Sequence, residues 1–122
     1  MSTLRDGKYI SLETFRKNGV GVKTPVWFAV APDDTFYVYT EDNSGKVKRI
    51  RNNPRVRVAP CDIRGNVAGE FVEASARLLK EGEPEYNAAN KILNQKYWLK
   101  RLFDLASFLR FHKRAGIAIR LS

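Results

Sequence analysis

The stretch TFYVYTEDNSGKVKRIRNNPRVR, residues 35–57, is the part of the chain that most strongly determines the fold. Its first six residues are aromatic or β-branched and predict a strand. A polar turn follows, and the basic segment 45–52 then carries Val47 and Ile50 three positions apart. This spacing predicts a short helix with one apolar stripe. Pro54 closes the segment, because a residue before proline is pushed out of helical geometry.

The start of this expected helix has the chemistry of an anion site. The first backbone N–H groups of a helix have no partner inside it and point outward, at the positive end of the helix dipole. Ser44 adds a hydroxyl group and Lys46 adds a positive charge at the same place. These residues alone leave two interpretations open: a phosphate site, or a solvated basic helix that Asn43 or Ser44 merely caps.

Upstream of this stretch, alternating apolar residues and tight turns predict strands joined into a meander. Asn18-Gly19 suits a hairpin turn, and Pro32–Asp34 is a second tight turn. Pro25 lacks a backbone N–H, so it marks an edge or a place where strand pairing switches. The expected strands cover residues 9–15, 20–30 and 35–40.

Downstream, the period of the apolar residues changes from strand to helix and back. Two strands are expected at 55–61 and 71–79, separated by a turn around Gly65. Pro84 suits the first turn of a helix, and the helical period continues to Phe111 with a break near residues 95–97, which predicts a helical pair. The final segment, residues 116–121, alternates again and predicts a closing strand.

The expected architecture is therefore mainly β, in one domain over residues 1–122. About six strands form a small antiparallel barrel with a short inserted helix and a C-terminal helical pair. Both faces of the second strand are apolar, with Trp27 opposite Val26 and Phe28. We expect a second copy of the chain to cover the outside of this barrel, giving a homodimer.

Composition excludes several classes of protein. The 122 residues contain one cysteine and one histidine, so an internal disulfide and a zinc site are not expected. No apolar run is long enough to span a membrane, and the N-terminus lacks the apolar core of a secretory signal. We therefore expect a cytoplasmic protein with no membrane partner and no structural metal.

The formal net charge of +9 needs a partner of opposite sign. A basic surface suits nucleic acid, but the charges are spread along the chain, and no zinc knuckle, RRM aromatic signature or helix-turn-helix pattern accompanies them. A small polyanionic ligand, steered inward by the basic surface, is the other candidate. Charge alone does not decide between them.

Several linked motifs resemble those of a known superfamily. They are Thr24-Pro-Val-Trp-Phe28, Thr40, Ser44-Gly-Lys46, Arg49-Ile50 and Asn53-Pro-Arg-Val56. At this spacing they resemble the pyridoxamine 5'-phosphate oxidase-like, FMN-binding split-barrel superfamily, and within it the small oxidoreductases that use the deazaflavin coenzyme F-420. The resemblance covers nearly the entire chain. It implies an antiparallel split β-barrel, Greek-key-like, that forms a homodimer with FMN or F-420 bound along the subunit interface.

The resemblance also implies roles for individual residues. One group would surround the cofactor phosphate: Thr40, Ser44, Gly45 and Lys46. A second group would lie along the ring or the ribityl chain: Lys23, Thr24, Pro25 and Val26. Tyr39 and Trp27 either stack on the ring or pack in the core or a dimer interface. Arg49 and Arg51 either meet anionic groups of a longer cofactor tail or are solvated.

Two departures limit the resemblance. The pyridoxamine phosphate oxidases carry a basic residue where Ala29 stands, and a C-terminal Trp and Arg pair that the end of this chain, residues 119–122, lacks. We therefore do not expect vitamin B6 oxidation. The choice between FMN and F-420 stays open. No catalytic acid–base pair is predicted: His112 is expected at a helix end or on the surface, and Cys61 is not expected to act as a nucleophile.

The expected function is that of an oxidoreductase that transfers hydride to or from an unknown small substrate, with the chemistry supplied by the cofactor. A carrier or sensor that binds the same cofactor without turnover is one alternative. A basic β-barrel that binds nucleic acid is another. A membrane-surface role for the helix at 98–109 is less consistent with the sequence, because its apolar stripe is explained by covering the barrel.

Overall fold

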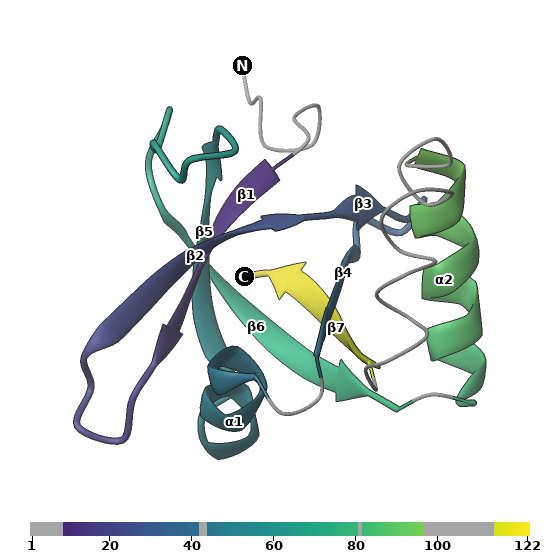
Figure 1. The fold of residues 1–122 in the computed structure, drawn as a ribbon, viewed down its shortest axis with the longest axis horizontal. Coiled ribbons are helices and arrows are strands. Elements are labelled where there is room, and N and C mark those ends of the chain that lie inside the picture. The colour runs from purple at the N-terminus through teal and green to yellow at the C-terminus, as the bar shows by residue number, and fades with distance from the viewer. Residues whose placement is uncertain (1–8, 42–43, 81, 97–113) are drawn as a thin grey trace.

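The computed structural model describes residues 9–41, 44–80, 82–96 and 114–122 (Figure 1). Within these ranges seven strands form one antiparallel sheet in the order β2-β1-β5-β6-β7-β4-β3, with two helices packed beside it. The strands are β1 (Tyr9–Phe15), β2 (Gly21–Trp27), β3 (Ala29–Val30), β4 (Phe36–Glu41), β5 (Arg55–Cys61), β6 (Val72–Leu79) and β7 (Arg114–Leu121). The helices are α1 (Gly45–Asn52) and α2 (Pro84–Lys96).

The strand expected at residues 20–30 changes partner at Phe28, where it is divided into β2 and β3. β2 pairs with β1, whereas β3 pairs with β4. Because β2 and β3 are the two edges of the sheet and follow one another in the chain, the sheet closes on itself at Phe28 and remains open further along β2. This is the geometry of a split barrel, and the change of partner accounts for seven strands where about six were expected.

The prediction for Pro25 is confirmed in one respect: it lies on an edge strand. The pairing switches three residues later, at Phe28. The expected meander is confirmed, because the strand expected at residues 20–30 pairs with β1 through β2 and with β4 through β3. On their other sides, β1 pairs with β5 and β4 pairs with β7. The hairpins β1–β2 and β3–β4 therefore lie at opposite ends of the sheet order, and only the barrel closure brings them together.

The core lies inside the barrel and is made of alternating strand residues, as the period of two requires. Phe28 and Phe36 are buried at the closure, with their rings stacked at 5.4 Å between centroids. α1 contributes Val47 and Ile50, both buried, which confirms the apolar stripe predicted for this helix. The other core members are Ile10, Leu12, Val26, Val38, Val56, Val58, Ala74, Ala76, Ile117 and Ile119.

α2 covers the outer face of the sheet near β3 and β4 (Figure 1). Tyr86, Ala89 and Leu93 of this helix form a second cluster with residues of the sheet that include Ala29 and Tyr37. Pro84 is the first residue of α2, as predicted. The second helix of the expected pair, its apolar stripe at 98–109 and His112 lie outside the described residues. In the part of the chain described, no helix combines the length and apolarity that crossing a membrane requires.

Candidate functional site

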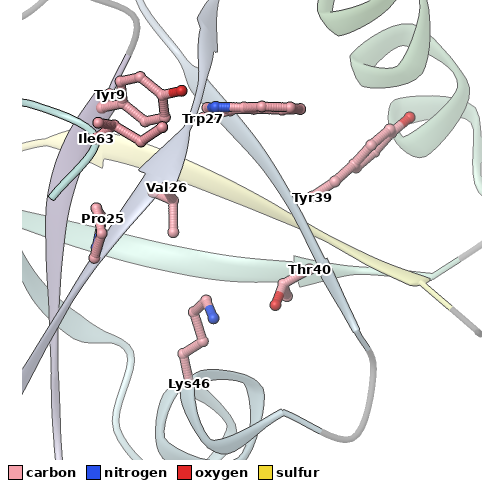
Figure 2. Close-up of a pocket in the computed structure, with 8 residues that line it drawn as sticks. All are labelled: Tyr9, Pro25, Val26, Trp27, Tyr39, Thr40, Lys46 and Ile63. Carbon is pink, nitrogen blue, oxygen red and sulfur yellow. The ribbon is translucent and has the colours of Figure 1, made fainter. Parts of the chain in front are cut away.

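A pocket of about 400 Å³ lies where β2 and β4 diverge. Its volume falls in the range of pockets that bind small ligands, about 300–1,000 Å³. The lining residues come from three strands, α1 and the β5–β6 connection (Figure 2): Tyr9, Pro25, Val26, Trp27, Tyr39, Thr40, Lys46 and Ile63. The split in the barrel thus brings together segments that are far apart in the sequence.

One end of the pocket is formed by the turn from β4 into α1. Ser44 caps α1, and its hydroxyl oxygen accepts a hydrogen bond from the backbone N–H of Val47 at 3.4 Å. The Thr40 hydroxyl donates to the Ser44 hydroxyl at 3.3 Å, so the end of β4 is tied to the start of the helix. The first turn of α1 contains no acidic residue. This end of the pocket is therefore positive and rich in hydrogen-bond donors.

The position of Lys46 follows from the burial of the opposite side of the helix. Val47 and Ile50 face the core, and Lys46, one residue before Val47, is directed to the mouth of the split. Figure 2 shows the Lys46 amine and the Thr40 hydroxyl on the same side of the pocket. Asn53 ends the helix in an extended conformation, with its N–H bonded to the Arg49 carbonyl at 2.8 Å. The helix boundaries predicted from Ser44 and Pro54 are confirmed.

Arg49 holds the first turn of α1 against the sheet. Its Nε donates a hydrogen bond of 2.6 Å to Oγ1 of Thr14, a buried residue of β1. Its guanidinium lies over Gly45, where an added Cβ would be 2.7 Å from Nη1. Burial and, next, the positive charge of Arg16 lower the pKa of the Arg49 guanidinium. The potential of this corner is therefore positive, and Gly45 is the residue that leaves room for Arg49.

The other end of the pocket is aromatic. Tyr9 and Trp27 lie 6.3 Å apart between ring centroids, at an interplanar angle of 52°. Tyr39 stacks on Tyr86 of α2 at 5.5 Å. Trp27 and Tyr39 are half-buried, pack against the cluster beneath α2 and also line the pocket. Packing and ligand contact, the two interpretations of these side chains, are therefore compatible with each other.

The structure places the ten predicted cofactor-binding residues in three groups. Five line the pocket: Pro25, Val26, Tyr39, Thr40 and Lys46. Ser44 and Gly45 lie beside Lys46 at the start of α1. The remaining three, Lys23, Thr24 and Arg51, are not among the lining residues.

Each of these three has a different location. The Lys23 amine lies over the Phe71 ring at 4.8 Å from its centroid. Thr24 is in register with the buried Leu12, and its own hydroxyl oxygen is buried with no hydrogen-bond partner among the described residues. Arg51 is exposed on α1. The cofactor contacts expected of Lys23, Thr24 and Arg51 stay predictions.

Sequence reasoning missed two lining residues. Tyr9 begins β1 and faces the same side of the sheet as Trp27, its partner in the β1–β2 register. Ile63 lies in the β5–β6 connection. Tyr9 could have been found from its place in an alternating strand. Ile63 could have been found because a large apolar residue in an otherwise polar turn is unusual.

The residues that line the pocket offer little acid–base chemistry. Among the eight lining residues the ionisable side chains are Lys46 and the two tyrosines, Tyr9 and Tyr39. Cys61 ends β5, and burial raises the pKa of its thiol, which favours the unreactive protonated form. No group of three His, Cys, Asp or Glu side chains gathers within the described ranges. The arrangement can bind and orient a ligand.

The predicted fold class, a mainly β split barrel, is confirmed, and solved structures of several proteins share this fold. One chain with this fold is a pyridoxamine 5'-phosphate oxidase-related, FMN-binding protein from Nostoc punctiforme, with a TM-score of 0.63 and 12% identity over 93% of this chain and 70% of that one. HutZ, the heme storage protein from Vibrio cholerae, matches with a TM-score of 0.71 and 11% identity over 94% of this chain and 82% of its own. General Stress Protein 26 from Bacillus anthracis matches with a TM-score of 0.59 and 21% identity over 98% of this chain and 84% of its own.

No protein-family model matches the sequence, and no curated protein sequence matches it. The structural likeness, at 11–21% identity, is a likeness of fold. The predicted closeness to the F-420-dependent oxidoreductases stays a prediction.

Proposed function

We propose that this protein binds a phosphate-bearing flavin-type cofactor, FMN or the deazaflavin F-420, in the pocket between β2 and β4. With this cofactor it acts as an oxidoreductase that transfers hydride to or from a small substrate. The observation that carries the proposal is the polarity of the pocket. Lys46 and Thr40 lie on one side of it, and Tyr9, Trp27 and Ile63 lie across from them (Figure 2).

The cationic end fits a phosphate group. Lys46 would supply a charge-assisted hydrogen bond, and the first turn of α1 would supply backbone donors and the positive end of its dipole. The Thr40 and Ser44 hydroxyls add polar hydrogen-bonding groups next to Lys46. None of the eight lining residues is a carboxylate that would repel the anion.

The opposite end fits a planar ring. Pro25 and Val26 form a wall on β2, an edge strand that pairs with β1 alone in the described sheet. Half of the backbone donors and acceptors of such a strand point away from its partner and can bond the polar edge of a ring. Bound flavins supply the hydride chemistry, and the protein supplies binding, orientation and exclusion of water. The lining residues support binding and orientation.

The proposal includes a second copy of the chain, with the cofactor sites along the interface. Large aliphatic side chains remain exposed in the described part of one copy: Val20, Ile63, Val67, Val72 and Leu121. Ile63 and Val67 belong to the same β5–β6 connection, and contiguous exposed apolar groups are typical of surfaces that a partner covers. Sedimentation at several concentrations measures the stoichiometry, and a monomer at every concentration would contradict this part of the proposal.

Heme is the second candidate ligand, because HutZ, with a TM-score of 0.71, is a heme storage protein. Heme needs an axial ligand, and histidine, cysteine, methionine and tyrosine serve this role in proteins. Tyr9 and Tyr39 are the lining residues of these types. Titration with hemin tests the candidate, since an iron-ligated heme gives a shifted Soret band that a flavin does not.

The experiment for the leading proposal is a fluorescence titration with FMN and with F-420. Replacing Lys46 by Ala should weaken binding by about 10- to 150-fold, the equivalent of the 1.5–3 kcal/mol of a hydrogen bond to a charged group. Lys48→Ala is the matched control, because Lys48 is an exposed cation of the same helix that does not line the pocket.

The possible results separate the functions. Failure of both cofactors to bind would refute the proposal. Cofactor that binds but is not reduced by any donor would favour the carrier or sensor. Nucleic-acid binding that survives cofactor saturation and falls steeply with salt would instead favour the basic barrel.

A further inference from the structure

The connection between β5 and β6 is a small hairpin with Ile63 in its turn. Cys61 and Val67 form an antiparallel bridge, and the N–H of Ala68 bonds to the Pro60 carbonyl at 2.8 Å. The turn is Asp62–Gly65, closed by a bond of 3.0 Å from the Gly65 N–H to the Asp62 carbonyl. Asp at the first position and Gly at the fourth are typical of a type I turn. We call residues 60–68 the lip hairpin.

The shape of the lip hairpin is set by its own residues. The Asp62 carboxylate accepts bonds from the backbone N–H groups of Arg64 and Asn66, both at 2.9 Å, and from the Asn66 side chain at 3.0 Å. These bonds to Asn66 are the main reason that the pKa of Asp62 is lowered. Gly65 has φ of +86°, which favours glycine. The turn is therefore built before any ligand binds.

The lip hairpin lies against β2 at the pocket. A Cβ added to Gly65 would be 3.7 Å from the Pro25 ring, so the turn and Pro25 are in contact distance. Ile63 and Pro25 both line the pocket, beside Tyr9 (Figure 2). Ile63 is 64% exposed, more than any other large hydrophobic side chain in the described ranges. A rigid turn thus holds the most exposed of these apolar side chains over the aromatic end of the pocket.

We propose that Ile63 determines the affinity of the site for a flat aromatic ring by packing on its face, with Tyr9 and Trp27 on the other sides of that ring. The occupant would be the ring of an anionic ligand whose phosphate lies toward Lys46. The charge pattern supports this assignment: the lining residues next to Ile63 are apolar or aromatic, and the one lining cation lies across the pocket (Figure 2). This inference rests on the proposed function and adds the recognition of the ring to that of the phosphate.

The test uses riboflavin, which has the ring without the phosphate, beside FMN and inorganic phosphate. Ile63→Ala should weaken riboflavin and FMN by the same factor, about tenfold, because a few methylene groups lose their contact with the ring. Ile63→Asp should weaken both further. The affinity for inorganic phosphate, measured by competition with FMN, should be the same in the Ile63 variants as in the wild type. Arg64→Ala is the matched control, because Arg64 is an exposed residue of the same turn that does not line the pocket.

Each result supports or overturns the inference. FMN that binds the wild type but binds the Ile63 variants equally well would refute the role of Ile63 and leave the proposed function intact. FMN that fails to bind the wild type would refute both. Ile63→Asp could instead act by breaking a dimer. If the variant is monomeric at low concentration, and regains the wild-type affinity for FMN at concentrations where the dimer forms again, Ile63 contacts a second copy and not the ring, and the inference is wrong. Unfolding midpoints of the Ile63→Asp and Arg64→Ala variants that equal the wild-type midpoint exclude a loss of folding, and Ile63→Val provides the same comparison with a milder change.

Discussion

The contact between Gly45 and Arg49 yields a sharp prediction about the turn that forms the cationic end of the pocket. Alanine favours a helix over glycine by about 0.5–1 kcal/mol, so Gly45→Ala at the start of α1 would ordinarily stabilise the protein. Here the new Cβ would be 2.7 Å from Nη1 of Arg49, closer than side chains tolerate. The guanidinium must therefore move, and the 2.6 Å bond from its Nε to Thr14 is lost or weakened.

The two effects can be separated with a double-mutant cycle. The Arg49–Thr14 bond has a charged donor and is only part-buried, so we assign it about 1.5 kcal/mol, the low end for such bonds. Gly45→Ala alone should then be neutral or destabilising by up to about 1 kcal/mol, since about 0.5–1 kcal/mol of helix propensity offsets the lost bond. In an Arg49→Ala background, the same substitution should stabilise by about 0.5–1 kcal/mol.

The assay is urea unfolding followed by circular dichroism, with the midpoint compared at constant slope. Thr14→Val supplies an independent check, because it removes the acceptor and keeps the size of the buried side chain. In that variant Gly45→Ala should again lose its penalty. A Gly45→Ala effect that is the same in all three backgrounds would refute the proposed interlock of Gly45, Arg49 and Thr14.

Two further predictions concern the scaffold that holds the pocket open. Phe28→Ala should cost about 3–5 kcal/mol in unfolding free energy, because this fully buried ring stacks on Phe36 where the barrel closes; a cost below about 1 kcal/mol would contradict that role. The Tyr37 hydroxyl donates to Glu85 at 2.9 Å, and burial, aided by Glu85, raises the pKa of Tyr37 to about 12 from its ordinary value of 10.0. The unfolded tyrosine ionises first, so stability present below pH 10 should decline between pH 10 and 12, and Tyr37→Phe should flatten this part of a stability–pH curve.

The elements could be predicted because their signals are local. Ser44, the Val47–Ile50 spacing and Pro54 define α1 over residues 45–52, and the structure agrees. Pro84 begins α2 for the same kind of reason. The order of the strands could not be predicted in this way. Pairing of β1 with β5 and β4 with β7 depends on where a twisted sheet closes. Pro25 indicated an edge or a change of partner in this strand, but the local sequence did not place the change at Phe28.

In the pocket, too, the residues with local signals were predicted and those placed by long-range contacts were not. Lys46 was predicted as a member of a phosphate site from its place at the start of the expected helix, and Thr40 from the family resemblance, and both line the pocket. Ile63 was missed because its contact with the pocket depends on the docking of the lip hairpin against Pro25, far away in the sequence. Lys23 illustrates the opposite case: its strand lines the pocket, but its side chain lies over Phe71.

The central claim, that an anionic group of a planar ligand lies at Lys46, is tested most directly by comparing FMN with riboflavin in the wild type and in Lys46→Ala. The two ligands share the ring and differ by the phosphate, so their affinity ratio isolates the phosphate contact. We predict that the wild type prefers FMN and that Lys46→Ala reduces this preference by about 10-fold or more, with riboflavin affinity little changed. An affinity ratio that is the same in both proteins, or a wild type that binds riboflavin as tightly as FMN, would contradict the claim.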